Sequence, residues 1–288
     1  MQQLLYNEKE LYRSDLDFLN KSAICRLTSF LRITPDFFIG GVQKGGTTSL
    51  YAALVQHPQI IPGKFKEVFY YGNSDNYKNG LEHYKQFFAT SFHKKSKENK
   101  SGKPALTVDA STNTFESKEA PKRILKDNPN AKIIFIVRNP VERTFSQYKM
   151  SRKNGWDLAT FEQALELEET RIADGAKRAN EFSGHNYVLQ RLGYKARSRY
   201  VEHMKNWFNE FPNENIMVLN SESLFQNHTA AFENICNFLK IDTVKVKFDR
   251  LNEGPEEKMN ESTKVSLQNY FKPYNEELFT LLKMRYDW

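Results

Sequence analysis

Short apolar runs alternate along the chain with longer stretches in which apolar residues recur at helical spacing. The apolar runs predict strands at 37–39, 64–71, 105–108, 131–137 and 216–219. The amphipathic stretches predict helices at 48–56, 76–88, 116–127, 160–172, 195–211 and 221–240, and a further helix that begins at 139–142 and continues past 146. The polar segments 93–103 and 174–186, which contain glycine, are predicted to be loops.

The order of these elements predicts the fold class. Alternating strands and helices are typical of α/β proteins, and the run at 131–137 is apolar throughout, as in a parallel strand covered on both faces. The sequence therefore predicts an α/β fold with a single domain, in which a central parallel sheet is flanked by helices. Residues 1–34 have a weaker amphipathic pattern and are predicted to be an N-terminal helical extension of a main domain at 35–288.

The most informative segment is a glycine-rich loop between the first strand and the first helix of this domain. Glycines stand at 40, 41, 45 and 46, and the hydroxyl residues 47–49 open the helix. Such a turn directs backbone N–H groups and the positive end of the helix dipole at one point, which suits phosphate or sulfate. ATP- and GTP-binding loops carry lysine directly after their second glycine, whereas this chain has Gly46 there and its lysine at Lys44. The pattern favours an anion-binding loop without a γ-phosphate and magnesium; the alternative is a glycine turn that only joins strand to helix.

Three segments carry a resemblance to a known family. QKGGTTSL at 43–50 resembles the 5′-phosphosulfate-binding loop of sulfotransferases that use 3′-phosphoadenosine-5′-phosphosulfate (PAPS). KEVFYY at 66–71 is similar to the segment after the loop helix in their carbohydrate branch, and IFIVRNPVERTFSQY at 134–148 is similar to their 3′-phosphate segment. Weaker similarity at 198–219 and 251–282 extends the resemblance over 35–288. The resemblance implies a sulfotransferase domain with a P-loop-like 5′-phosphosulfate loop, PAPS as donor, 3′-phosphoadenosine-5′-phosphate (PAP) as product and no metal.

The resemblance also implies roles for individual residues. The donor would be held by one set of residues: Gln43, Lys44, Gly45, Gly46, Thr47, Thr48, Ser49, Arg138, Ser146 and Lys258. Lys44 would also be catalytic, because its ammonium can stabilise the negative charge that develops on the leaving phosphate. Glu67 would be the base that removes the proton of the acceptor, with His185 and His203 as the alternative bases.

The ligands of parallel sheets lie beyond the carboxyl ends of the strands, so we expect the loop, Ser111, Arg138 and Glu67 to meet in one crevice. The chain departs from heparan-type members of the family, which carry lysine in place of Ala110 and a glycine- and lysine-rich loop in place of 251–258. It also has Phe69 where the family often has histidine. We predict transfer of a sulfuryl group to a hydroxyl or amine of a carbohydrate or glycan-like acceptor; the alternative acceptor is the hydroxyl of a small molecule or natural product.

Two other classes of function stay open, one because of the loop and one because of the charge of the chain. Its 42 Lys+Arg against 35 Asp+Glu give a net charge of +7, which favours polyanionic partners in general. A nucleotide kinase with an altered loop would require ATP and magnesium, and a polyanion-binding module would have no catalysis. As an enzyme, the protein is predicted to bind a donor and an acceptor but no nucleic acid.

The apolar runs are too short for a transmembrane helix, and the first residues lack the pattern of a signal peptide. We therefore predict a cytoplasmic protein without a membrane span. A luminal enzyme separated from its anchor would show the same pattern. The sequence does not indicate which oligomeric state the protein has.

Overall fold

The computed structural model describes residues 5–11, 23–251 and 257–288. Its α/β domain divides into two compact units. The sheet unit contains residues 23–137 and 206–251, and the helical unit contains residues 5–11, 138–205 and 257–288. Three stretches that carry predictions lie outside the described residues: 1–4 and 12–22 of the N-terminal extension, and 252–256 before Lys258.

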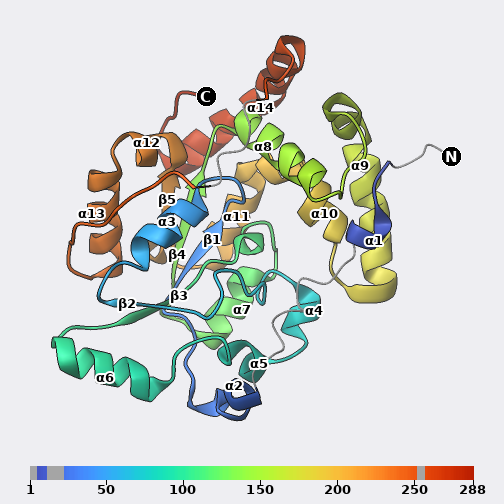
Figure 1. The fold of residues 1–288 in the computed structure, drawn as a ribbon. Coiled ribbons are helices and arrows are strands. Elements are labelled where there is room, and N and C mark those ends of the chain that lie inside the picture. Colours follow the sequence, from blue (N-terminus) through green and yellow to red (C-terminus); the bar gives the residue numbers. More distant parts are fainter. Residues whose placement is uncertain (1–4, 12–22, 252–256) are drawn as a thin grey trace. The chain divides into compact units, whose positions relative to one another are not determined.

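The described strands of the sheet unit are all parallel and lie in the order β2-β3-β1-β4-β5 (Figure 1). Their bounds are β1 Phe37–Gly41, β2 Ile60–Pro62, β3 Leu106–Asp109, β4 Lys132–Val137 and β5 Ile216–Asn220. Phe38 of β1 lies opposite Asp109 of β3 and Ile133 of β4. Strands β2 and β3 lie on one side of β1, and β4 and β5, which come later in the chain, lie on the other side. The winding direction of the sheet therefore changes next to β1. The predicted α/β fold with a central parallel sheet is confirmed.

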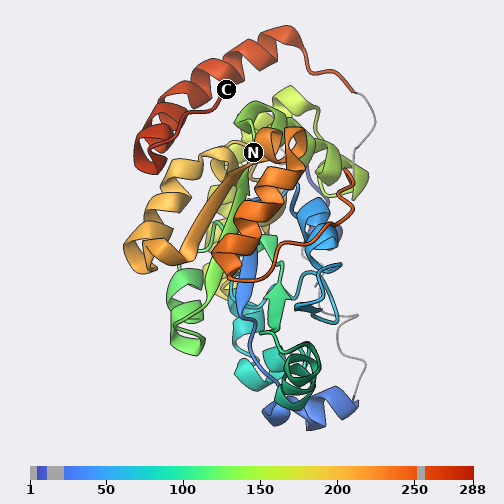
Figure 2. The ribbon, with the colours of Figure 1, turned by 90° about the vertical axis from the view of Figure 1, so that its left-hand side faces the viewer.

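Helices cover both faces of this sheet, with α3, α12 and α13 on one face and α7 on the other (Figure 1 and Figure 2). Phe37 and Ile39 of β1 pack with Leu50 of α3 in one core, whereas the ring of Phe38 turns to the opposite face and lies 5.6 Å from that of Tyr71. The helices of the sheet unit are α2 Ala23–Leu27, η1 Ser29–Leu31, α3 Thr47–Leu54, α4 Ser74–Tyr77, α5 Leu81–Lys85, α6 Ser91–Ser101, η2 Thr112–Thr114, α7 Ala120–Asp127, η5 Asn213–Asn215, α12 Ser221–Gln226 and α13 His228–Leu239.

The described part of the helical unit contains α1 Glu8–Leu11, α8 Pro140–Lys153, α9 Phe161–Arg178, the π-helical turn η3 Ala179–Ser183, α10 Tyr187–Leu192, η4 Ala196–Ser198 and α14 Glu261–Leu282. Helix α11 (Tyr200–Glu210) begins in this unit and ends in the sheet unit. Phe145 of α8 packs with Phe161 of α9 and Phe271 of α14. The fully buried Arg171 forms a 2.9 Å ion pair with the buried Asp157, so these charges belong to the core of the unit.

The strand predicted at 64–71 is wrong. The edge strand of the sheet is β2, Ile60–Pro62, and the chain is irregular from 63 to 70. Phe69 has φ of 52°, which no extended strand contains. The N–H groups of Val68 and Phe69 bind the hydroxyl of Ser111 instead of a neighbouring strand, each at 2.9 Å. A side-chain contact far along the sequence therefore replaces the pairing that the apolar pattern predicts.

The predicted loops at 93–103 and 174–186 are largely helical. Helix α6 begins at the cap Thr90, whose Oγ1 accepts from the N–H of His93 at 3.1 Å, and ends at Gly102 with φ of 67°. Helix α9 continues to Arg178 and through η3. A Cβ added at Gly175 would lie 2.5 Å from Cβ of Val188, so this glycine allows α9 and α10 to pack closely rather than forming a turn.

Two predicted helices are interrupted, and two begin late. The helix predicted at 76–88 divides into α4 and α5 at Gly80, which has φ of 83°. The helix predicted at 221–240 divides at Asn227, whose side chain caps α13 by accepting from the N–H of Ala230 at 3.3 Å. The α-helices predicted at 116–127 and at 195–211 start only at Ala120 and at Tyr200. Turn-forming and capping residues inside these apolar patterns explain the first two differences.

Candidate functional site

Glycines determine the backbone of the loop that follows β1. A Cβ added at Gly45 would lie 2.4 Å from the carbonyl oxygen of Ile136, and one added at Gly40 would lie 2.6 Å from Cε1 of Phe135. Gly46 has φ of 104° and is the N-cap of α3, where it offers no side chain to the helix. The first N–H groups of a helix have no partner within that helix, and here no cap side chain accepts from them, which suits the binding of an anion.

Lys44 lies within this loop and has φ of 70°, a left-handed conformation that is uncommon for a residue with a Cβ. Lys44 and Thr48 are half-buried, and Thr47 and Ser49 are buried. Oγ of Ser49 accepts a 2.9 Å hydrogen bond from the N–H of Leu251. The loop therefore combines backbone N–H groups, one ammonium and hydroxyls, and its last hydroxyl already binds the backbone of Leu251.

Glu67 lies on the irregular segment after β2, also in the sheet unit. Its Oε1 forms a 2.6 Å ion pair with Nζ of Lys66, and its Oε2 accepts from Oγ1 of Thr112 at 3.4 Å. The side chain of Glu67 is 24% exposed, so solvent and ligands can reach the carboxylate. The segment is attached to the end of β3, because the carbonyl of Lys66 accepts from the N–H of Ala110 at 3.0 Å.

A buried carboxylate organises the segment that carries Glu67. Oδ1 of Asp109 accepts from Oγ and from N–H of Ser111, at 2.6 and 2.9 Å, and its Oδ2 accepts from the hydroxyl of Tyr84 at 2.6 Å. The same Oγ of Ser111 accepts from the N–H groups of Val68 and Phe69. The hydroxyl of Ser111 therefore donates one hydrogen bond and accepts two at the same time. We refer to Asp109, Ser111 and Tyr84 as the Asp109 network.

Burial raises the pKa of Asp109 to about 6, although the hydrogen bonds from Ser111 and Tyr84 act in the opposite direction. Burial likewise raises the pKa of the Tyr84 hydroxyl well above its ordinary value. Sequence reasoning named Ser111 but missed Asp109 and Tyr84. The position of Asp109 at the end of a buried strand could have indicated its role. The contact between Asp109 and Tyr84 could not be predicted, because it depends on how α5 packs.

The end of β1 and the segment of Glu67 both lie beside Thr112. A Cβ added at Gly41 would be 3.2 Å from the carbonyl oxygen of Thr112, and the hydroxyl of Thr112 donates to Glu67. Strands β1 and β3 are parallel neighbours, so both loops leave the sheet at its carboxyl edge. The end of β1, Ser111 and Glu67 therefore lie near one another in the sheet unit, and the approach of residues 42–49 to Glu67 stays a prediction.

Arg138 and Ser146 belong to the helical unit. Arg138 directly follows β4, is half-buried, and accepts a 2.9 Å hydrogen bond on its carbonyl from the hydroxyl of Tyr200. The side chain of Asn139 caps α8 by accepting from the N–H of Val141 at 3.0 Å, as predicted. Ser146 is half-buried two turns into α8, and Lys258 is exposed. Their roles at the donor remain predictions, as do those of Gln43, Gly45, Gly46, Thr47, Thr48 and Ser49.

The two histidines considered as alternative bases form hydrogen bonds inside the helical unit. Nε2 of His185 lies 2.6 Å from Oε1 of Gln190, and Nε2 of His203 lies 3.2 Å from the carbonyl oxygen of Ala196. Neither contact places an imidazole beside a second catalytic group. The choice of base among Glu67, His185 and His203 therefore stays a prediction.

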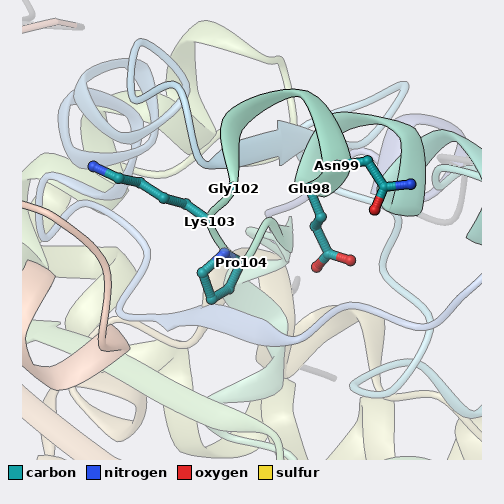
Figure 3. A pocket seen from close by; sticks show the side chains of 5 residues that line it. All are labelled: Glu98, Asn99, Gly102, Lys103 and Pro104. Carbon is teal, nitrogen blue, oxygen red and sulfur yellow. The ribbon is translucent and has the colours of Figure 1, made fainter.

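Metal clusters, membrane-spanning helices and surface hollows are further features that bear on function. In residues 5–11, 23–251 and 257–288, no group of three or more His, Cys, Asp or Glu side chains could hold a metal ion. Within the same residues, no helix is long and apolar enough to cross a membrane. A hollow at the end of α6 is lined by Glu98, Asn99, Gly102, Lys103 and Pro104 (Figure 3). None of these five residues belongs to the predicted donor site.

Comparisons with known proteins give a consistent picture. The family model described as "Sulfotransferase domain" matches residues 34–275. A mouse protein named bifunctional heparan sulfate N-deacetylase/N-sulfotransferase 4 is 28% identical over 86% of this chain, and the match covers 30% of that relative. Human heparan sulfate glucosamine 3-O-sulfotransferase 5 is 26% identical over 75% of this chain, with 56% of the relative covered. The chain therefore spans about half, or less, of the length of these relatives.

A sulfotransferase from Alicyclobacillus acidocaldarius has a similar solved structure. The TM-score is 0.67 at 24% sequence identity, and the match covers 88% of this chain and 97% of that chain. At this identity the likeness concerns the fold alone. It agrees with the α/β fold of this chain.

Proposed function

The chain belongs to the sulfotransferase domain family, and on that premise we propose that it moves a sulfuryl group from PAPS to a hydroxyl or amine of a carbohydrate or glycan-like acceptor. The observation that carries the choice of donor is the loop after β1. It has the N–H groups of a helix start and an ammonium at Lys44, but Gly46 stands where a nucleotide kinase has the lysine that reaches the β/γ-phosphates.

In the proposed reaction, the acceptor oxygen or nitrogen attacks sulfur as the bond from sulfur to the bridging phosphate oxygen breaks, and PAP leaves. The loop binds the 5′-phosphate of the donor through its N–H groups and through the hydroxyls of Thr47 and Thr48. Lys44 stabilises the charge that develops on the leaving phosphate. Arg138, Ser146 and Lys258 bind the 3′-phosphate through charge-assisted and hydroxyl hydrogen bonds.

Glu67 accepts the proton that the acceptor loses. Its partial exposure and its position beside Thr112, next to the loop, support this assignment. A general base of this kind contributes about 10²- to 10⁴-fold to a rate. Nζ of Lys66, 2.6 Å from Oε1, orients the carboxylate of Glu67.

The proposed acceptor class rests on the relatives, whose names refer to heparan sulfate, and on the KEVFYY segment. Heparan sulfate itself is a weaker candidate, because Ala110 is fully buried at the position where heparan-type members carry lysine. The acidic residues at 253–257 also disfavour a densely sulfated polymer nearby. The same departures favour a second candidate, the hydroxyl of a small molecule or natural product. We also propose 35–288 as the catalytic domain and 1–34 as its extension.

A calorimetric titration with PAP, with 5′-AMP and with ATP plus magnesium tests the donor site. We expect binding that depends on the 3′-phosphate and weakens in Arg138→Ala. A preference for ATP with magnesium, or no preference over 5′-AMP, contradicts PAPS as the donor. Transfer from labelled PAPS to a panel of glycans and small hydroxyl compounds then identifies the acceptor class.

A further inference from the structure

Exposed apolar side chains gather at one edge of the sheet unit. Among the described residues, eight large apolar side chains are exposed, and four of them share this edge: Leu27 at 75%, Phe30 at 70%, Leu31 at 48% and Phe92 at 81%. They come from α2, η1 and the first turn of α6. We call these four residues the apolar edge. Single exposed apolar residues are ordinary, but a group of this kind indicates a contact surface.

Backbone and side-chain hydrogen bonds hold the two parts of the apolar edge together. Arg32 and Thr90 form an isolated antiparallel bridge, and Oγ of Ser91 donates to the carbonyl of Leu31 at 3.3 Å. The guanidinium of Arg32 also donates to the carbonyl of Phe88 at 2.6 Å. The segment before β1 is thus fixed against the start of α6, and Phe92 follows directly on the bonded Ser91.

The inner face of α6 is bound to the sheet unit through its charged and polar groups. Lys94 forms a 2.6 Å ion pair with Asp36, and Nζ of Lys97 donates to the carbonyl of Ile60 at 3.0 Å. Oε1 of Glu98, the only acidic side chain of α6, accepts from the N–H of Ala105 at 3.1 Å. The single carboxylate of the helix is therefore turned toward the body of the unit.

The outer face of α6 continues the apolar edge with positive charge. Phe92, Lys95 and Asn99 follow one another at the spacing of a single helix face, Lys100 is adjacent to Asn99, and all four are exposed. In the described residues, Lys95 and Lys100 have no carboxylate partner. Arg26, also exposed, adds a cationic group next to Leu27. The surface thus combines protruding apolar side chains with cations, and the basic run 93–103 receives a structural explanation.

We propose that this surface binds an anionic lipid bilayer. The apolar edge enters the boundary between headgroups and acyl chains, while Lys95 and Lys100 contact anionic headgroups. A sulfated glycan would use the lysines but would gain nothing from four exposed apolar side chains. A second copy across a two-fold axis would bring the lysines of both copies together, and like charges in contact oppose such a dimer. The proposal is independent of the reaction assigned above.

Co-sedimentation of the full chain with vesicles tests it. The vesicles contain phosphatidylcholine alone or phosphatidylcholine with phosphatidylserine. We expect binding that requires phosphatidylserine and weakens at high salt. The double variants Phe30→Ser/Phe92→Ser and Lys95→Glu/Lys100→Glu are each expected to weaken it at least about tenfold. Leu158→Ser is the matched control, because Leu158 is exposed but lies outside the apolar edge, and it should bind like the unmodified chain.

The results that overturn the proposal are equally specific. The proposal fails if the unmodified chain ignores phosphatidylserine or if Phe30→Ser/Phe92→Ser binds equally well. Retention on heparin that depends on Lys95 and Lys100, without vesicle binding, would assign the surface to a polyanion instead. A dimer that dissociates in Phe30→Ser/Phe92→Ser would assign it to a second copy. Thermal melting verifies that the variants fold, and all substituted side chains are exposed.

Discussion

Oγ of Ser111 donates a 2.6 Å hydrogen bond to Oδ1 of the buried Asp109. Because this hydroxyl also accepts from the N–H groups of Val68 and Phe69, the carboxylate at the end of β3 determines where the segment of Glu67 lies. Asp109 and Ser111 contact neither of the groups proposed to react. We therefore expect them to act as positioning residues for the proposed base.

Ser111→Ala is expected to lower kcat at least about tenfold, since two N–H groups near Glu67 lose their acceptor and the carboxylate loses its fixed position. KM for the donor should change much less. A double-mutant cycle with Glu67→Gln separates positioning from general damage. If Ser111 acts through Glu67, Ser111→Ala has little further effect once Glu67 is replaced.

The exposed Ser101→Ala serves as the control for that cycle, because Ser101 bonds only to its own helix end. Two results are informative in different ways. Full activity of Glu67→Gln would remove Glu67 as the base. The other result is that Glu67→Gln is slow and that Ser111→Ala slows it by the same factor as it slows the unmodified chain. That result would exclude a positioning role of Ser111 and would leave Glu67 as the base.

Asp109 should make the stability of the protein depend on pH. Its pKa is raised from 3.8 to about 6 in the folded chain, so the folded state binds this proton more tightly than the unfolded chain. The free energy of unfolding contributed by Asp109 is therefore highest below pH 4 and falls as pH rises through 6, by about 3 kcal/mol in all and by about 2 kcal/mol between pH 4 and 6. Urea unfolding of the unmodified chain and of Asp109→Asn at several pH values isolates this contribution.

The difference in unfolding free energy between the two proteins is expected to shift in favour of Asp109→Asn as pH rises from 4 to 6. Both side chains have nearly the same shape, and the amide still offers an oxygen to Ser111. A difference that stays constant over this range would mean that the folded carboxyl titrates like an exposed one. Other carboxylates titrate in both proteins and cancel in the comparison.

The sequence predicted those parts of the site that depend on local chemistry. β1, α3 and the start of α8 follow from an apolar run, a glycine turn and the cap Asn139, and each appears in the structure close to its predicted bounds. The strand expected at 64–71 failed because a side chain more than forty residues away, that of Ser111, takes the N–H groups that a strand would pair. Contacts set by sheet register leave no trace in a local pattern.

The same distinction applies to the acidic residue beneath the site. In the sequence, Asp109 is only an acidic residue at the end of a predicted strand. Its place in the Asp109 network depends on Tyr84, whose hydroxyl α5 brings to Oδ2. The helix predicted at 76–88 placed Tyr84 inward correctly, but its partner could not be derived from spacing. Periodicity identifies which residues are buried, whereas the hydrogen-bond partner of a buried polar group depends on tertiary packing.

Gly45→Ala is expected to disrupt the loop. The added Cβ would lie 2.4 Å from the carbonyl oxygen of Ile136, a backbone atom that cannot move away without disturbing β4. We expect a loss of about 1–3 kcal/mol in stability and a marked loss of PAP affinity. Gly102→Ala is the control, because a Cβ added at Gly102 has open space around it. This substitution lowers the stability only through the left-handed φ that alanine would have to adopt. Equal PAP affinity in both variants would argue against this loop as the donor site.

Lys44 combines a proposed catalytic ammonium with a left-handed backbone, and two substitutions separate these properties. Lys44→Ala and Lys44→Gly should both lower the single-turnover rate of sulfuryl transfer about 10²- to 10³-fold, because each removes the cation that stabilises the leaving phosphate. Lys44→Gly should be more stable than Lys44→Ala by about 1 kcal/mol, since glycine adopts a φ of 70° without a steric cost. Rates are measured with labelled PAPS and stabilities by urea unfolding, with the exposed Lys95→Ala as control. Transfer at an undiminished rate in both folded variants would show that charge on the leaving phosphate is stabilised by another group.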